Sequence, residues 1–333
     1  MTDLEKHIKT IVQNINIKLQ HTKNEKELLL LAYDVKYVLD IILDSYPTID
    51  IPDSFWSILE NNFLLPDEDF YNNFISMRHT NLNICSLLDY LPPSIESNSS
   101  SEPNYSFDEA IKITQDFFDM YDKDISNYFH SLVQNDCIIQ STLDCYGTTI
   151  SIFSENISFI FIDKNIGDII LLITLAHETI HSYINSLMYQ IDYDERTKLY
   201  LNTLNEVYSY FIEFVFASFL HDTYKIDTSQ INNNHHNILI SCLTDFKELF
   251  DELCNLEDDE YNIERYLQAE ADVYGIILAH HYYNYYLANP ELAKEDLINL
   301  MIDSKRYDKH FLLNNYGLNE SDLYDHKALL LRK

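Results

Sequence analysis

The chain has 333 residues, of which 46% are hydrophobic and 23% charged, so disorder along its whole length is excluded. The formal net charge is -32, from 54 acidic and 22 basic residues, and such a field disfavours binding to nucleic acid or to anionic membranes. With only 4 glycines and 7 prolines, the many tight turns of an all-β sandwich or propeller are also excluded. The composition predicts a mainly α protein.

The first part of the chain, residues 4–91, shows helical periodicity of apolar residues. Pro47 and Pro52 divide it into separate helices, which we interpret as packing surface. Pro92 and Pro93 open a polar tract that is typical of a linker. We therefore predict an N-terminal helical lobe over 1–92, a linker over 93–104 and a second domain over 105–333.

The second domain begins with Ser106, a helix-capping residue, and the helix is predicted to continue to about residue 133. Two runs rich in β-branched and aromatic residues, 148–152 and 158–162, flank a turn at 154–156 and predict a hairpin or small sheet. The remaining apolar periodicity predicts a series of helices over 168–189, 195–221, 239–254, 260–287, 290–301 and 308–315.

One motif in this series points to chemistry: residues 177–181 read HExxH inside the helix predicted from 168. Histidines four residues apart lie on one helix face, so His177 and His181 can bind one metal ion together. Glu178 follows the first histidine and is placed to act as general base towards a metal-activated water. The helix before the motif, 169–176, is almost wholly apolar, and burying these three polar residues without a metal would be costly.

A catalytic zinc site needs a third protein ligand, and the next predicted helix offers Glu206, 25 residues after His181. Two antiparallel helices joined by a loop would bring Glu206 beside the histidines. Glu213 lies two turns further along the same face, with Ser209 between them, and either is predicted to orient a ligand through a hydrogen bond. Mixed histidine and carboxylate ligands favour zinc over other divalent ions. His235 and His236 follow three asparagines and are predicted to lie in a solvated polar loop.

Segments 174–182 (TLAHETIHS) and 206–209 (EVYS), together with Glu213, resemble the zinc motifs of the oligoendopeptidase F and thimet oligopeptidase family, which are HExxH gluzincins. Other segments that resemble this family's catalytic region are 105–110, 159–162 with Asp168, and 312–318. The resemblance covers about 105–323. It implies a helical oligopeptidase-like domain with a small edge sheet and one Zn²⁺ ion, which cleaves short peptides held in a channel.

The chain departs from that family at three places. Ile180 stands where the family usually has glycine, and the large N-terminal part is reduced to about ninety residues. The family also supplies a histidine and tyrosines that stabilise the tetrahedral oxyanion, whereas the matching stretch here, 263–274, contains no histidine. Tyr266 and Tyr274 are the nearest substitutes. Loss of one oxyanion donor typically costs roughly 10²–10³ in rate.

These observations predict a zinc-dependent endopeptidase that hydrolyses short or unstructured peptides. A substrate backbone is expected to pair with an edge strand formed by Ser158, Phe159, Ile160, Phe161 and Ile162. Peptides are the expected partners, with no nucleic acid and no membrane, and the sequence does not indicate an oligomeric state. Five cysteines without a CxxC pair, and no signal peptide in the first residues, predict a soluble cytoplasmic protein.

Three alternatives remain open at this point. The protein could be a dedicated maturation protease or effector for one protein partner, because the shortened N-terminal part would leave the cleft more open. It could be a catalytically weakened zinc-binding protein of the same fold that recognises peptides, which the missing histidine favours. A purely structural helical protein is the third alternative, and stoichiometric zinc in the purified protein would exclude it.

Overall fold

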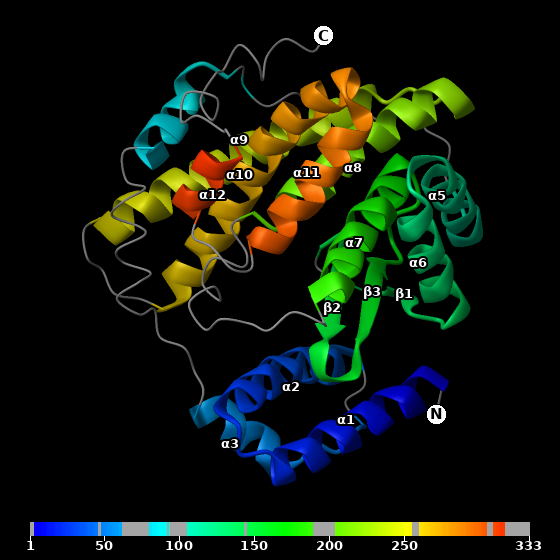
Figure 1. The fold of residues 1–333 in the computed structure, drawn as a ribbon, viewed down its shortest axis with the longest axis vertical. Helices are drawn as coiled ribbons and strands as arrows, with labels where there is room; N and C mark the ends of the chain where they lie inside the picture. Colours follow the sequence, from blue (N-terminus) through cyan, green and yellow to red (C-terminus); the bar gives the residue numbers. More distant parts are fainter. Residues whose placement is uncertain are drawn as a thin grey trace. The chain divides into compact units, whose positions relative to one another are not determined.

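The computed structural model describes residues 3–45, 48–61, 80–91, 93, 105–142, 145–188, 204–254, 260–304 and 309–316. It is mainly helical with one three-stranded sheet, which confirms the predicted fold class (Figure 1). Contacts divide the chain into two compact units: the first contains 1–64, 106–167 and 182–192, and the second contains 65–105, 168–181 and 193–333. Among the described residues, no helix is both long and apolar enough to cross a membrane.

Besides the sheet, the described part of the first unit contains the helices α1 (Asp3–His21), α2 (Glu25–Ser45), α3 (Asp53–Asn61), α5 (Phe107–Tyr121) and α6 (Lys123–Gln134). The single helix predicted over 106–133 is therefore two helices. Asp122 causes the break: its backbone is extended, with φ −158° and ψ 126°, and its carboxylate caps α6 by accepting hydrogen bonds from the backbone N–H groups of Asp124 and Ile125.

The sheet has the strand order β1-β3-β2, formed by β1 (Ile138–Ser141), β2 (Gly147–Ile152) and β3 (Ile157–Asp163). Strands β2 and β3 form the predicted hairpin, with Ile150 opposite Phe159 in antiparallel register. Strand β1, which the sequence did not indicate, pairs with β3 in parallel, with Ile139 opposite Phe161. The prediction that 158–162 form an edge strand is therefore wrong. β3 is the central strand, because β1 pairs with its residues Ile160–Asp163 and β2 pairs with Ile157–Ile162 on the other side.

The N-terminal helices pack against the turn of this hairpin. Asp34 on α2 is fully buried and accepts hydrogen bonds from the backbone N–H groups of Phe153 (2.7 Å) and Ser154 (2.9 Å). Lys18 on α1 pairs with Glu155 at 2.7 Å. This grouping differs from the predicted division, which placed 1–92 in a lobe of its own. Of the predicted linker 93–104, all but Pro93 lies outside the described residues.

Asp34 should make stability depend on pH. Burial raises its pKa from 3.8 to about 6, although the hydrogen bonds that it accepts oppose the shift. The folded state therefore binds this proton more tightly than the unfolded state. The resulting stabilisation is present below about pH 4 and is lost as the pH rises through 6. Urea titrations measure the free energy of unfolding of the wild type and of Asp34→Asn. We expect the difference between the two proteins, wild type minus variant, to fall by roughly 2–3 kcal/mol from pH 4 to pH 7. Parallel stability curves for the two proteins would contradict this expectation.

The second unit is helical, and its principal elements are α8 (Glu206–Phe219), the π-helical turn η4 (Leu220–Tyr224), α9 (Ser229–Cys254), α10 (Glu260–Ala288), α11 (Pro290–Asp303), α12 (Lys309–Asn315) and the short 3₁₀ turn η1 (Ser86–Asp89). Helix α10 packs against both α8 and α9 (Figure 1). The last three predicted helices are confirmed to within two residues. Helix α9 begins ten residues earlier than predicted, and the predicted helix start at residue 195 lies outside the described residues.

Helix α7 (Ile169–Met188) belongs to both units, with its residues up to His181 in the second. It begins as predicted, because the carboxylate of Asp168 accepts a hydrogen bond from the backbone N–H of Ile170 at 2.8 Å. Helix α8 is buried along nearly its whole length. The polar residues that interrupt such an apolar helix need partners inside the protein.

Candidate metal centre

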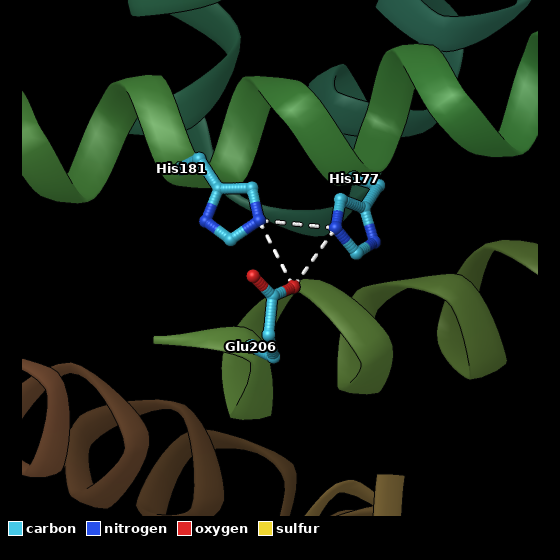
Figure 2. Close-up of side chains that lie close together, drawn as sticks. All are labelled: His177, His181 and Glu206. Carbon is cyan, nitrogen blue, oxygen red and sulfur yellow. Dashed lines mark hydrogen bonds and ion pairs between the residues drawn. The ribbon is translucent and has the colours of Figure 1, made fainter. Parts of the chain in front are cut away.

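The side chains of His177 and His181 project from successive turns of α7 towards Glu206 in the first turn of α8 (Figure 2). The two histidine Nε2 atoms are 3.0 Å apart, and each lies 3.1 Å from Glu206 Oε2. Ligand atoms about 2.0 Å from a tetrahedral zinc ion lie about 3.3 Å from one another. The three atoms thus have nearly the spacing that zinc requires, and within the described part of the chain they form the one cluster of this kind.

The position of Glu206 depends on close packing between α8 and α10. Gly275 on α10 faces the first turn of α8, and a Cβ atom at this position would lie 2.5 Å from the Cβ of Glu206. It would also lie 3.0 Å from a ring carbon of Tyr210. Only glycine permits this approach. The backbone of α10 therefore determines where the carboxylate of Glu206 can lie.

Glu213 contacts Nδ1 of His177, the ring nitrogen that does not face Glu206. Its Oε1 lies 2.5 Å from His177 Nδ1, and its Oε2 lies 2.5 Å from His235 Nε2. A carboxylate only accepts, so His177 donates through Nδ1–H. A neutral imidazole protonated at Nδ1 carries its lone pair on Nε2, the atom that faces His181 and Glu206. The structure thus places Glu213 against His177 Nδ1, and its role in orienting a metal ligand stays a prediction.

Asn205 lies next to His181. Its side-chain amide nitrogen is 3.3 Å from His181 Nδ1. Turning this amide about its last bond would place its oxygen there instead, as an acceptor for Nδ1–H. His181 would then also carry its lone pair on Nε2. Sequence reasoning did not identify Asn205, although it immediately precedes Glu206.

The electrostatics of the cluster favour a bound cation. Burial alone would lower the pKa of His177, but Glu206 and Glu213 together raise it well above its ordinary value. Burial alone would likewise raise the pKa of Glu206, yet His181 and His177 hold it well below its usual range. Glu213 has its pKa lowered to about 2 because His235 and His177 outweigh its burial. The two carboxylates are thus ionised and offset positive charge held by the imidazoles or by a metal.

Two further residues border the cluster, and the sequence analysis did not single them out as site residues. The ring of Tyr210 lies edge-on to the ring of His177 with 5.2 Å between centroids, and its hydroxyl donates to Asp272 at 3.1 Å. Burial, together with the charge of Glu206, raises the pKa of Asp272 to about 6. Tyr210 follows Glu206 by four residues, so helical spacing alone could have indicated it.

Two other predicted site residues lie on these helices. Glu178 follows His177 in α7 and is 7% exposed. Ser209 on α8 is fully buried, but its hydroxyl has no hydrogen-bond partner among the described residues. The described residues therefore show no bond from Ser209 to either histidine, and its role in orienting a ligand stays a prediction.

Tyr266 and Tyr274, the predicted oxyanion donors, belong to a second buried cluster. The hydroxyl of Tyr266 donates to Glu270 at 2.9 Å, and that of Tyr274 donates to the side-chain oxygen of Asn81 at 2.8 Å. Lys309 Nζ lies 2.6 Å from Glu270 and 4.2 Å from the centre of the Tyr274 ring. Both hydroxyls are therefore engaged away from the histidines, and the structure does not bring them to the metal centre.

His235 was also misplaced by the sequence analysis, which predicted a solvated loop. It lies inside α9 and is 2% exposed. Its ring packs edge-on against Phe214, with centroids 4.6 Å apart. The three asparagines before it, which are typical of loops, are part of the helix because tertiary packing outweighs their low propensity.

No family model and no curated protein matches the sequence. Several solved structures resemble the fold. A Bacillus anthracis protein assigned as an oligoendopeptidase F has a TM-score of 0.53 and 13% identity, over 99% of this chain and 74% of its own. Another protein assigned as an oligoendopeptidase F has a TM-score of 0.54 and 13% identity, over 92% of this chain and 63% of its own.

PZ peptidase A, solved with an inhibitor, has a TM-score of 0.53 and 12% identity, over 88% of this chain and 62% of its own. The chain therefore spans between 62% and 74% of the length of these three proteins. At such low identity the likeness concerns the backbone arrangement alone. This chain has the fold of these proteins.

Proposed function

We propose that the protein is a zinc-dependent endopeptidase of the oligoendopeptidase type, which acts in the cytoplasm on short or unstructured peptides. One observation carries this proposal: one side-chain atom from each of His177, His181 and Glu206 lies 3.0–3.1 Å from the other two. The two histidines belong to the HExxH motif that also contains Glu178. The shared fold with proteins assigned as oligoendopeptidases supports the choice of substrate class.

His177, His181 and Glu206 would hold the ion. Zinc supplies Lewis acidity, which polarises a peptide carbonyl and makes a water molecule more acidic. Glu213, and Asn205 with its amide oxygen turned towards His181 Nδ1, would keep the two imidazoles in the orientation that presents Nε2. Glu178 takes the proton of the attacking water and delivers it to the leaving amine. The hydroxyls of Tyr266 and Tyr274 take no part in this scheme, because Glu270 and Asn81 already bind them.

Removal of the metal tests the proposal. We expect the purified protein to contain about one zinc per chain by plasma mass spectrometry. A mixed peptide library followed by mass spectrometry should show internal cleavages that a chelator abolishes and added zinc restores. Zinc without any cleavage would contradict the peptidase and indicate the peptide-recognition alternative. Cleavage that survives complete zinc removal would contradict the mechanism.

A further inference from the structure

His235 is not one of the three candidate metal ligands, but it contacts Glu213, which contacts one of them. Its Nε2 lies 2.5 Å from Glu213 Oε2, while the other oxygen of the same carboxylate binds His177. Glu213 therefore lies between two imidazoles, one from α7 and one from α9. Since a carboxylate only accepts, both imidazoles donate to it.

Apart from its bond to Glu213, the side chain of His235 packs against aromatic rings. Its ring packs edge-on against Phe214 and Tyr210, with centroids 4.6 and 6.0 Å away. Its Nδ1 is buried and has no hydrogen-bond partner among the described residues. A buried imidazole with one unpaired nitrogen is more costly than an apolar side chain of similar size. The bond to Glu213 is what offsets that cost.

The bond has a geometric consequence for the metal centre. A glutamate side chain has three rotatable bonds, and a hydrogen bond to Oε1 alone leaves the carboxylate free to rotate about that contact. A second bond to Oε2, from a side chain buried in another helix, fixes the plane of the carboxylate. The orientation of His177 is then fixed in turn, because its Nδ1–H must point at Oε1.

We propose that His235 is a positioning residue of the metal centre, which acts through Glu213 to hold His177 in the orientation that binds zinc. The proposal rests on the proposed zinc site, and the test uses the metal alone. Asparagine and glutamine at position 235 form a matched pair of similar polarity. The amide nitrogen of glutamine can occupy the place of Nε2 and donate to Glu213, whereas that of asparagine is too short to reach.

The zinc dissociation constants of the variants are to be measured by competition with a chromogenic chelator. Loss of the group that hydrogen-bonds the non-ligating nitrogen of a metal-binding histidine typically weakens metal binding roughly 10–100-fold. We expect His235→Asn to raise the dissociation constant about tenfold and His235→Gln to raise it less than about threefold. In a Glu213→Gln background, His235→Asn should add less than about twofold, because the connection to His177 is already altered. His236→Asn, at the next position of α9, controls for a polar substitution in this helix.

Urea unfolding of the metal-free proteins separates positioning from general destabilisation: a His235→Asn protein that is still fully folded under the assay conditions, yet binds zinc about tenfold more weakly, has lost positioning and not its fold. Equal zinc affinity of His235→Asn and wild type would overturn the proposal, as would an undiminished effect in the Glu213→Gln background. A wild type that binds zinc but cleaves no peptide, while His235→Asn binds zinc weakly, would support the proposal and contradict only the peptidase. A wild type that binds no zinc would overturn both.

Discussion

Replacing Glu178 with glutamine is expected to lower the turnover number for peptide hydrolysis by roughly 10²–10⁴-fold, the usual contribution of a general base. Glutamine has nearly the same shape as glutamate but cannot accept the proton of the attacking water. The ligands His177, His181 and Glu206 are untouched by this change, so the zinc content should stay at about one ion per chain. A quenched fluorescent peptide and metal analysis of the same preparation measure the two quantities.

Glu248→Gln provides the matched control, because it makes the same chemical change at an exposed position of α9. Its turnover and zinc content should equal those of the wild type. If Glu178→Gln cleaved peptides at the normal rate, the general-base assignment would be wrong. If it lost zinc as well as activity, Glu178 would instead be needed for the architecture of the site.

Gly275→Ala should have the second largest effect. In an ordinary helix, replacing glycine with alanine stabilises the protein by roughly 0.5–1 kcal/mol. Here the new Cβ would lie 2.5 Å from the Cβ of Glu206, an atom too close to the backbone of α8 to move alone. We expect a loss of roughly 1–3 kcal/mol in the free energy of unfolding, as for other overpacked sites. Zinc affinity should fall at least about tenfold, because α8 must move and carries Glu206 with it.

Two measurements test this expectation, urea unfolding of the metal-free protein and zinc competition. Leu287→Ala serves as control: its side chain is 63% exposed on the same helix, and its replacement should change zinc affinity little. A Gly275→Ala protein that is more stable than wild type and binds zinc normally would show that α8 and α10 are not constrained at this point.

The sequence was sufficient for features that depend on residues close together in the chain. The histidines of the HExxH motif share a helix face because the α-helix has 3.6 residues per turn, and this holds whatever surrounds the helix. The helix starts at Ser106 and Asp168 are likewise local, since each side chain caps backbone groups within three residues of itself. Glu206 could be inferred because a carboxylate in an apolar helix requires a partner.

Features that join distant segments were decided only by the tertiary structure. Strand β1 lies about twenty residues before β3, and its parallel pairing, which turns β3 into the central strand, has no local signal. Tyr266 and Tyr274 have the residue type of oxyanion donors, but both hydroxyls bind Asn81, which lies 185 and 193 residues away from them in the chain.

His235 shows the same limit within the metal centre. The histidine motif and the carboxylate that lies beside it could be inferred from the sequence, because helical periodicity and the cost of burying charge act on each segment separately. The partner of Glu213 depends on how α9 packs against α8, and this packing is the sum of many weak contacts that no short stretch of sequence contains. The sequence by itself thus determined which residues can bind a metal, while the tertiary structure decided which residues hold them in place.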